Sequence, residues 1–395
     1  MHRYRMKRKR IWRAYAGSYM TAICLCLSFL FCAPHYAGSD YRDKLENLGI
    51  FGESRKESVL GQDGCTPIPL DKGVMWTFGD TILGSWKGDL SVDSTFEDSA
   101  VIKGMISNSL AFTDLPDDET IRCLDFMFYK ENGTVAAFIK PLPGEDPSVW
   151  RFWAVDGIEI NGTVYVYYII VFIDKTIPKN KSLMPIRVMG VGIAEWPKPA
   201  SWKPGDAVSF KRAGKIFFEG EPAFGDSIIR RGEHLYLIGH GPAGDKRVPA
   251  YIARVPVRSL KTRARYEFLD RNGAWSRSLA QALPCVNDVM GEPSLSYNEF
   301  MKQYMIIYCG LEGSIKSITF GDFPELKNKK AAVLYIPPPL PKLKTKPYNF
   351  YYSSKEIFHT QKAIYAIYIN PAIYQPILLK IPYSALPSDT ILRLY

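Results

Sequence analysis

Helical periodicity is nearly absent from this chain of 395 residues, which argues against a helical architecture. No P-loop and no Gly-x-Gly-x-x-Gly motif follows a strand, so nucleotide chemistry has no support. A Ser-His-Asp order typical of serine hydrolases is missing as well. The five histidines form no cluster and the seven cysteines contain no Cys-x-x-Cys pair. We therefore expect no zinc site, no other metal and no cofactor.

A large excess of basic over acidic residues is lacking once the first residues are set aside. Seven of the 50 Lys and Arg residues precede the first acidic residue, Asp40, so the rest of the chain carries 43 basic residues against 40 acidic ones. The formal net charge of +10 thus belongs mainly to the N-terminus. No basic stripe remains elsewhere, and nucleic acid is not an expected partner.

The basic N-terminus precedes an uncharged stretch, residues 14–38, with an apolar centre at residues 20–32. This is the layout of a secretory signal, although a good cleavage site is lacking because Phe31, His35 and Tyr36 are bulky. A cleaved signal and an uncleaved membrane anchor both remain open. We expect a leader over residues 1–39, one domain over residues 40–395, and a secreted or cell-envelope location, periplasmic or extracellular.

Four cysteines lie beyond the leader, at Cys65, Cys123, Cys285 and Cys309. In an oxidising compartment they could form two disulfides with three connectivities. Four free thiols are an equally good interpretation, and the sequence leaves both open.

The most informative stretch runs from Leu60 to Leu83. Two apolar runs, residues 66–70 and 74–78, are joined by Asp-Lys-Gly, a turn that predicts a β-hairpin because Gly accepts a positive φ. Asp63 precedes the first strand and Asp80 follows the second, each beside a glycine. The two carboxyl groups should meet at one end of the hairpin, an arrangement suited to acid/base chemistry on a sugar. The alternative is that both aspartates only cap strand ends.

Similar hairpins recur along the chain, with turns rich in Gly, Asn and Asp. After the first, they are predicted at residues 158–168, 227–238, 295–308, and 363–369 with 377–381. A polar residue beside each hairpin recurs at intervals of roughly 70 residues, which suits a propeller blade with loop insertions; these residues are Asp80, Asp156, Asp226, Glu292 and Asn370. We therefore predict an all-β fold, a five-bladed β-propeller. A β-sandwich is the competing fold, less favoured because its strands would not group into five similar blocks.

Aromatic side chains near these positions are candidates for stacking on sugar faces. Trp153, three residues before Asp156, is the first choice, and Trp76, Trp150 and Tyr297 are others; packing between blades is the alternative role for such strand aromatics. His240, which follows a strand of the third unit, is a candidate for the central funnel. The Pro-rich run 336–347 is interpreted as a stiff connector between the fourth and fifth units.

Several blocks occur in a characteristic order: DG…LDKG…WTFGDT, FWAVDGIEINGTVYVYY, AFGDSIIRRGEHLYLIGHG and GEPSLSYNEFMKQYMIIY. With them the chain resembles a bacterial five-bladed propeller family that is catalogued as a domain of unknown function. That family is associated with endo-D-arabinofuranases, which cut the D-arabinan of mycobacterial cell walls. More distantly, the layout is similar to arabinanases, β-xylosidases and levansucrases with five blades.

The resemblance implies roles for particular residues. The paired acids of the first blade match Asp63 and Asp80. Glu292 falls where related propellers place an acid of a later blade, which makes it the general-acid candidate. Asp156 and Asp226 are implied as pKa modulators or ligands of sugar hydroxyls. Two departures concern the substrate: Asn370-Pro371 stands where a His-Pro-like pair is expected, and the Lys-rich segment 327–347 is unusual.

Together these observations predict a glycoside hydrolase that cleaves furanosidic linkages of a polysaccharide, arabinan above all. The expected catalytic residues are Asp63, Asp80 and Glu292, and the expected substrate contacts are Asp156, Asp226, Trp153, Trp76 and His240. A monomer acting on a polysaccharide or oligosaccharide is expected. The alternatives are a non-catalytic glycan-binding propeller and a transferase acting on sucrose or fructan.

Overall fold

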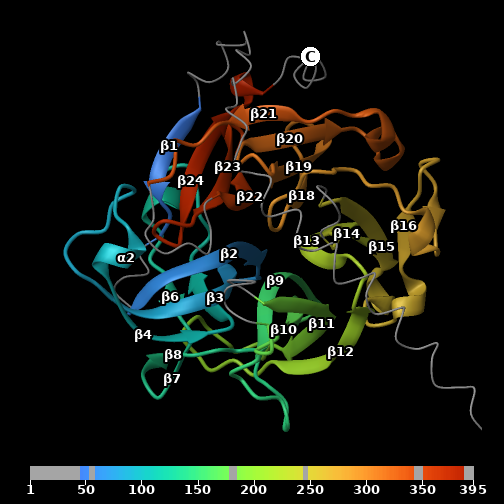
Figure 1. Ribbon diagram of the computed structural model, residues 1–395. Helices are drawn as coiled ribbons and strands as arrows, with labels where there is room; N and C mark the ends of the chain where they lie inside the picture. The colour runs from blue at the N-terminus through green and yellow to red at the C-terminus, as the bar shows by residue number, and fades with distance from the viewer. Residues whose placement is uncertain (1–44, 53–57, 178–184, 243–247, 342–349, 387–395) are drawn as a thin grey trace, which may run out of the picture.

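Five antiparallel sheets surround a central axis like the blades of a propeller (Figure 1). The computed structural model describes residues 45–52, 58–177, 185–242, 248–341 and 350–386. The predicted all-β, five-bladed propeller is confirmed. The predicted leader lies outside the described residues, and the boundary at residue 40 stays a prediction.

Each blade begins with a strand at the axis and continues outward through its neighbours in the sheet. Blade 1 contains β2 (Val59–Pro69), β3 (Val74–Trp86), β5 (Ser109–Thr113) and β6 (Met127–Phe128), with β4 (Ala100–Ile106) on the second half of β3. Blade 2 contains β9 (Trp150–Ile160), β10 (Thr163–Ile173), β11 (Ile186–Pro197) and β12 (Lys211–Phe218). Blade 3 contains β13 (Ala223–Arg231), β14 (His234–His240), β15 (Ala250–Pro256), β16 (Glu267–Leu269) and β17 (Trp275–Ser276).

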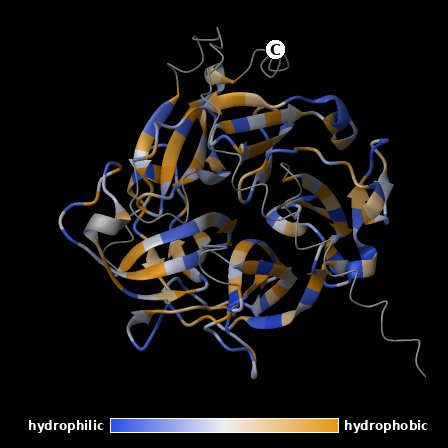
Figure 2. Ribbon diagram, viewed as in Figure 1, coloured by the Kyte–Doolittle hydropathy of each residue, from blue (hydrophilic) through white to orange (hydrophobic). Residues whose placement is uncertain are grey.

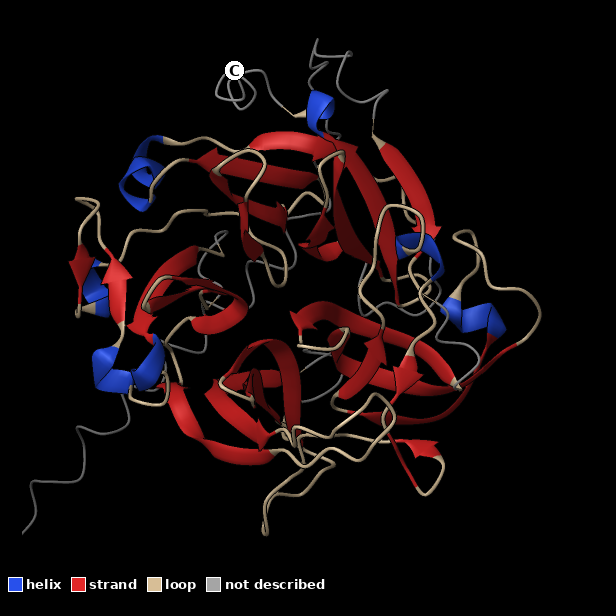
Figure 3. Ribbon diagram, turned by 180° about the vertical axis from the view of Figure 1, so that it is seen from behind, coloured by secondary structure: helices blue, strands red, loops and turns tan. Residues whose placement is uncertain are grey.

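The last two blades and the minor elements complete the ring. Blade 4 contains β18 (Ser294–Asn298), β19 (Gln303–Cys309), β20 (Ile315–Phe320) and β21 (Ala332–Tyr335). Blade 5 contains β22 (Tyr352–His359), β23 (Ala363–Asn370), β24 (Gln375–Pro382) and, at its outer edge, β1 (Glu46–Ile50). A small ribbon pairs β7 (Lys130–Glu131) with β8 (Thr134–Val135). The one α-helix in the described part is α2 (Phe96–Ser99), and short 3-10 helices lie around the ring (Figure 3) at Ile121–Cys123, Val257–Ser259, Arg263–Arg265, Leu279–Gln281, Phe323–Asn328 and Tyr383–Ala385.

The first and last strands of the chain close the ring. β1 pairs antiparallel with β24, from Glu46 opposite Lys380 to Ile50 opposite Ile377. Lys380 Nζ donates to Glu46 Oε1 at 3.0 Å across this junction. Blade 5 therefore combines strands from both ends of the described chain, and their pairing closes the ring.

The hydrophobic core consists of five clusters, one between each pair of neighbouring blades. The cluster between blades 1 and 5 includes Phe78 and Tyr365, and the one between blades 1 and 2 includes Ile68 and Tyr168. Burying a side chain such as Phe78 contributes about 1.5–3 kcal/mol. Apolar residues concentrate accordingly in the strands and hydrophilic ones in the outer loops (Figure 2). The blades are thus held together mainly by packing between sheets.

The local turn signals correspond to real hairpins. Pro69 faces Val74 across the turn that contains Gly73, whose φ is +82°, and Ile160 faces Thr163 across the turn at Asn161 and Gly162. The fifth predicted hairpin exists, but it is formed by the second and third strands of blade 5. The axial strand of that blade, β22, was not predicted because its sequence YSSKEIFH is largely polar. The described part of the Pro-rich run, 336–341, has no regular structure and connects β21 toward β22, as predicted.

The four cysteines beyond the leader are free thiols in the structure. Cys65, Cys285 and Cys309 are buried, and Cys123 is exposed. Of the two interpretations left open by the sequence, the structure has the one without disulfides.

Candidate active site

Asp63 and Asp80 meet across an irregular segment of the first hairpin. Gln62 faces Thr81 and Gly64 faces Phe78, so Asp63 lies opposite the Gly79-Asp80 pair where the register shifts. The predicted meeting of the two acids is present. Their surroundings differ from the prediction, because β2 and β3 continue past them and the acids lie within the strands. Gly64 and Cys65 have φ values of +81° and +68°, which identify the distortion as a bulge that re-aims the side chain.

A cavity of about 570 Å³ opens above these two residues. Five residues predicted as site residues line it: Asp63, Asp80, Trp153, His240 and Glu292. Tyr352 and Tyr374 of blade 5 line it as well, and much of the remaining wall is aliphatic or aromatic, at Ile82, Phe96, Ile102, Met105, Ile169, Ile186, Val188, Met290 and Phe350. The cavity therefore receives side chains from all five blades and combines a few polar groups with a large apolar wall.

Asp63 and Asp80 are both held in conditions that favour the protonated carboxyl group. Burial raises the pKa of Asp63 well above its usual value, and the carboxylates of Glu292 and Asp80 raise it further. The hydroxyl of Tyr374 opposes this shift by donating to Asp63 Oδ2 at 2.8 Å. Burial also raises the pKa of Asp80 to about 6, against the opposing influence of Arg151 and Trp153. Among the carboxyl groups that line the cavity, these two have a pKa raised by burial.

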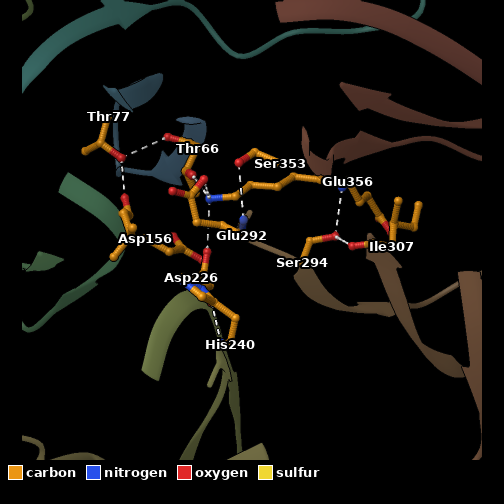
Figure 4. Close-up of polar contacts among 12 residues, drawn as sticks. Thr66, Thr77, Asp156, Asp226, His240, Glu292, Ser294, Ile307, Ser353 and Glu356 are labelled. Carbon is orange, nitrogen blue, oxygen red and sulfur yellow. Dashed lines mark hydrogen bonds and ion pairs between the residues drawn. The ribbon is translucent and has the colours of Figure 1, made fainter. Parts of the chain in front are cut away.

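Glu292 differs from the two aspartates because a cation lies beside it. Lys355 Nζ is 3.7 Å from Glu292 Oε2, and the lysine side chain is only 1% exposed. The backbone N–H of Glu292 donates to Ser353 Oγ at 3.2 Å. Figure 4 shows Glu292 between Thr66 of β2 and Asp226 of β13. The carboxylate of Glu292 is thus an ion-paired group, an environment suited to a charged nucleophile or base.

His240 forms a second ion pair below the cavity with Asp226 (Figure 4). Its backbone N–H and its Nδ1 both donate to Asp226 Oδ2, at 2.8 Å and 2.7 Å. Burial alone would lower the pKa of His240, but the Asp226 carboxylate outweighs it and the pKa is raised. Asp226 is fully buried, so it contacts His240 and not the cavity. It fixes the imidazole, and Nε2 is the nitrogen left for a ligand.

Asp156, predicted to reach the central funnel, does not line this cavity. Its carboxylate accepts from the N–H of Gly157 at 2.6 Å and from the N–H of Ile228 at 2.7 Å, which ties blade 2 to blade 3. It lies instead in a second hollow of about 310 Å³, together with Arg231 and Tyr297. Burial raises the pKa of Asp156 to about 7, with the two N–H groups opposing the shift.

The two predicted tryptophan contacts lie in different places. Trp153 lines the cavity on β9, as a stacking residue would. Trp76 is completely buried in the cluster between blades 1 and 5, and its Nε1 donates to Thr113 Oγ1 at 2.9 Å. It has no surface to offer a ligand and is a core residue.

Three polar atoms of the cavity residues are buried without a normal hydrogen bond in the described part of the chain. They are Asp80 Oδ1, Trp153 Nε1 and Glu292 Oε2. Glu292 Oε2 still has Lys355 Nζ at 3.7 Å, and Trp153 acts on Asp80 by lowering its pKa. A ligand with hydroxyl groups would complete the hydrogen bonding of these atoms.

Sequence reasoning missed Lys355 and Tyr374, which both contact the predicted acids. For Lys355, the available sequence signal was a lysine within the segment that forms β22 of blade 5. Asn370, singled out instead, is buried and accepts from the N–H of Ala372 at 2.9 Å in a turn. The adjoining Pro371 and Ala372 do line the cavity.

Neither a metal cluster nor a membrane helix is found within the described ranges. No group of three or more His, Cys, Asp or Glu residues there has the geometry to hold a metal ion. No helix there has the length and apolar character needed to cross a bilayer.

Comparison with solved structures finds similar proteins of low sequence identity, one of them with a TM-score above 0.5. A presumed hydrolase from Bacteroides ovatus has a TM-score of 0.56 and 15% identity, over 85% of this chain and 86% of that one. A GH43 enzyme from Xanthomonas citri has a TM-score of 0.48 and 12% identity, over 84% and 90%. A GH43 β-xylosidase/α-arabinofuranosidase from a compost metagenome has a TM-score of 0.45 and 11% identity, over 85% and 92%. At these identities the likeness concerns the fold alone.

Sequence comparison is more decisive about the family. No curated protein sequence matches the chain. A family model described as a domain of unknown function (DUF4185) matches residues 53–384, which include every cavity residue named above. The resemblance inferred from the motif blocks is thereby confirmed at the level of the family, and the chain belongs to the DUF4185 family of five-bladed propellers.

Proposed function

We propose that this protein is a glycoside hydrolase that cleaves furanosidic linkages in a polysaccharide, with arabinan as the substrate. One observation carries the proposal: three carboxyl groups, Asp63, Asp80 and Glu292, converge on one cavity in unlike electrostatic environments. Glycoside hydrolysis needs one carboxyl group that holds a proton and another that is ionised. Asp80 Oδ1 and Trp153 Nε1, atoms of two residues that line this cavity, have no hydrogen bond of normal length and angle in the described structure.

The proposed roles follow from the neighbours of each acid. Asp80, whose pKa is about 6, gives its proton to the leaving oxygen as the bond from the anomeric carbon to that oxygen breaks. Glu292, paired with Lys355, acts as the carboxylate that attacks the anomeric carbon or activates water. Burial is the largest cause of the raised pKa of Asp63, and the carboxylates of Glu292 and Asp80 both raise it further. This assignment reverses the sequence-based expectation that Glu292 is the acid.

The substrate, the endo mode of cleavage and the export of the protein are proposed from the sequence. The motif blocks shared with the arabinan-cutting family support an arabinan substrate and endo action. The basic and apolar leader supports export to the cell envelope or the medium, where such a polysaccharide would be met. Trp153 and His240 are proposed as contacts for sugar faces and hydroxyl groups.

The test is hydrolysis of D-arabinan and of L-arabinan by the full chain, with release of oligosaccharides followed by chromatography. Asp63→Asn, Asp80→Asn and Glu292→Gln each remove one carboxyl group while keeping its shape. Asp118→Asn is the matched control, because Asp118 accepts hydrogen bonds from Thr360 and Tyr365 outside the cavity. We expect product from the wild type and the control, and losses of 100-fold or more in the three cavity variants. Binding of arabinan without product would support the glycan-binding alternative and refute the hydrolase.

A further inference from the structure

Lys355 lies on β22 at the axis of the propeller, where four blades meet. Its Nζ donates to Thr66 Oγ1 of blade 1 at 2.9 Å and to the backbone oxygen of Asp226 in blade 3 at 3.2 Å. The carboxylate of Glu292, which leads into blade 4, is 3.7 Å away. Taking an ammonium group out of water costs several kcal/mol unless charges and hydrogen bonds replace the solvent. A lysine this deeply buried therefore needs its three partners.

The partners of Lys355 are unequal in charge. Thr66 and the Asp226 backbone offer neutral oxygens, so Glu292 is the carboxylate in ion-pair range in the described structure. Other titratable groups feel the ammonium at longer range from the elements packed around it, and these are Asp63 and Cys65 on β2, Asp156 on β9, Asp226 on β13 and His240 on β14. His240 is itself paired with Asp226, and Lys355 is paired with Glu292.

The same strand also fixes the backbone that carries Glu292. Ser353 Oγ accepts the N–H of Glu292, and Ser353 N–H donates to the oxygen of Met290 at 2.9 Å. A side chain at Gly291 is excluded, because its φ is +76° and a Cβ there would be 2.3 Å from Ser353 Oγ. β22 therefore holds Glu292 twice, through Ser353 at the backbone and through Lys355 at the carboxylate.

We propose that Lys355 is a positioning residue of the hydrolysis, an internal cation that pairs with the carboxylate of Glu292 and aims it into the cavity. The proposal rests on the function proposed above and deepens it, because it assigns the charged carboxylate to Glu292 and leaves proton donation to the aspartates. A lysine that only ties the blades together would affect stability alone. The distinction can be measured.

The decisive experiment is chemical rescue of the Lys355→Ala variant. This change removes a segment equivalent to propylammonium, so n-propylammonium should restore the missing charge, whereas 1-propanol restores only the volume. We expect kcat on arabinan to fall at least 100-fold with KM within about threefold, and propylammonium to recover tenfold or more. Lys198→Ala is the matched control, since Lys198 is 4% exposed and paired with Asp71 and Glu159 outside the cavity. It should keep wild-type kcat and show no rescue.

A second variant covers the case in which Lys355→Ala does not fold. Lys355→Met keeps the length of the side chain without its charge. We expect at least a 100-fold loss of kcat in folded protein, because the carboxylate of Glu292 then lacks the ammonium group that holds it in place. Wild-type kcat in folded Lys355→Met, or rescue by propanol as strong as by propylammonium, would overturn the proposal while leaving the hydrolase intact. A wild-type chain that cleaves no glycan would overturn the proposed function, and this role with it.

Discussion

Gly79→Ala is a change that should damage the reaction without damaging the fold. Gly79 is not in the left-handed region, so its backbone conformation suits alanine. A Cβ at this position would be 2.4 Å from Asp63 Oδ1, and its next nearest contacts, at 3.5 Å and 3.9 Å, are also atoms of Asp63. The added methyl group therefore meets one carboxyl group and no part of the core.

The size of the effect follows from this clash. Real Cβ contacts are essentially never under 3.0 Å and are usually beyond 3.4 Å, so the carboxyl group must move by about 0.6–1.0 Å. Tyr374, which donates to Asp63 Oδ2, would be displaced or would lose its hydrogen bond. Misplacement of a reacting group by about 1 Å can cost 100-fold in rate, so we expect kcat/KM to fall by about 10–100-fold. Stability should be unchanged or slightly higher, because alanine restricts the unfolded chain by about 0.4–1 kcal/mol.

The assay is kcat/KM on arabinan together with thermal unfolding. Gly104→Ala is the matched control, since a Cβ there meets no atom within 4 Å and its φ is ordinary. It should leave both quantities unchanged. In the double variant with Asp63→Asn, Gly79→Ala should add little, because both changes act on one group. A folded Gly79→Ala protein with wild-type activity would refute the reasoning that the position of Asp63 matters.

Four further outcomes are expected. Proton donation by Asp80 predicts that kcat/KM falls above about pH 6, and a pH profile without this alkaline limb would exclude the role. Because folding raises the pKa of Asp80, the ionised side chain destabilises the folded protein at neutral pH. Asp80→Asn should therefore raise the free energy of unfolding, measured in urea, by about 2 kcal/mol at pH 7.5. Tyr374→Phe removes the donor to Asp63 Oδ2, which should lower kcat/KM about tenfold with less than about 1.5 kcal/mol lost in urea unfolding; equal activity would contradict a role for that bond. His359 contacts Glu356 and Glu299 at 2.6 Å and 2.9 Å, and although burial opposes the shift these carboxylates raise its pKa to about 9. Its raised pKa gives stability that is complete below pH 6.5 and lost as the pH rises through about 9, so His359→Gln should cost about 3 kcal/mol at pH 6 and little at pH 9.5.

The parts of the fold found from sequence are those encoded locally. Turns such as Asn161-Gly162 carry their own conformational signal, and the strands beside them are apolar enough to be recognised. β22 was missed because it combines two properties that seldom coincide in a strand. It is buried at the axis, yet Ser354, Lys355 and Glu356 give it the composition of a surface segment.

In the site, too, contacts within one short segment were predictable from the sequence, whereas contacts between residues far apart in the sequence were not. Asp63 and Asp80 were found because one short hairpin contains both. Tyr374 bonds Asp63 across 311 residues of sequence, and Lys355 bonds Thr66 across 289. Such contacts exist only once the ring is assembled, so no spacing rule could indicate them.

Trp76 illustrates a different limit. β3 is a middle strand of blade 1 and is buried on both faces from Val74 to Ile82. Alternation of polar and apolar residues, which tells the two faces of a strand apart, is absent there. Trp153 was preferred to Trp76 only because of its closeness to Asp156, and packing is what makes Trp76 a core residue and Trp153 a cavity residue.

The pairing of β1 with β24 also determines when, during synthesis of the chain, the propeller ring can close. Glu46 is joined to the chain 334 residues before its partner Lys380. Lys355 and Tyr374, which contact the acids of the cavity, are likewise added only after the strands of the first four blades. The ring and its cavity are therefore completed late in synthesis. A chain interrupted before β22 would hold the paired aspartates of the first hairpin but neither the cation nor the tyrosine that controls them.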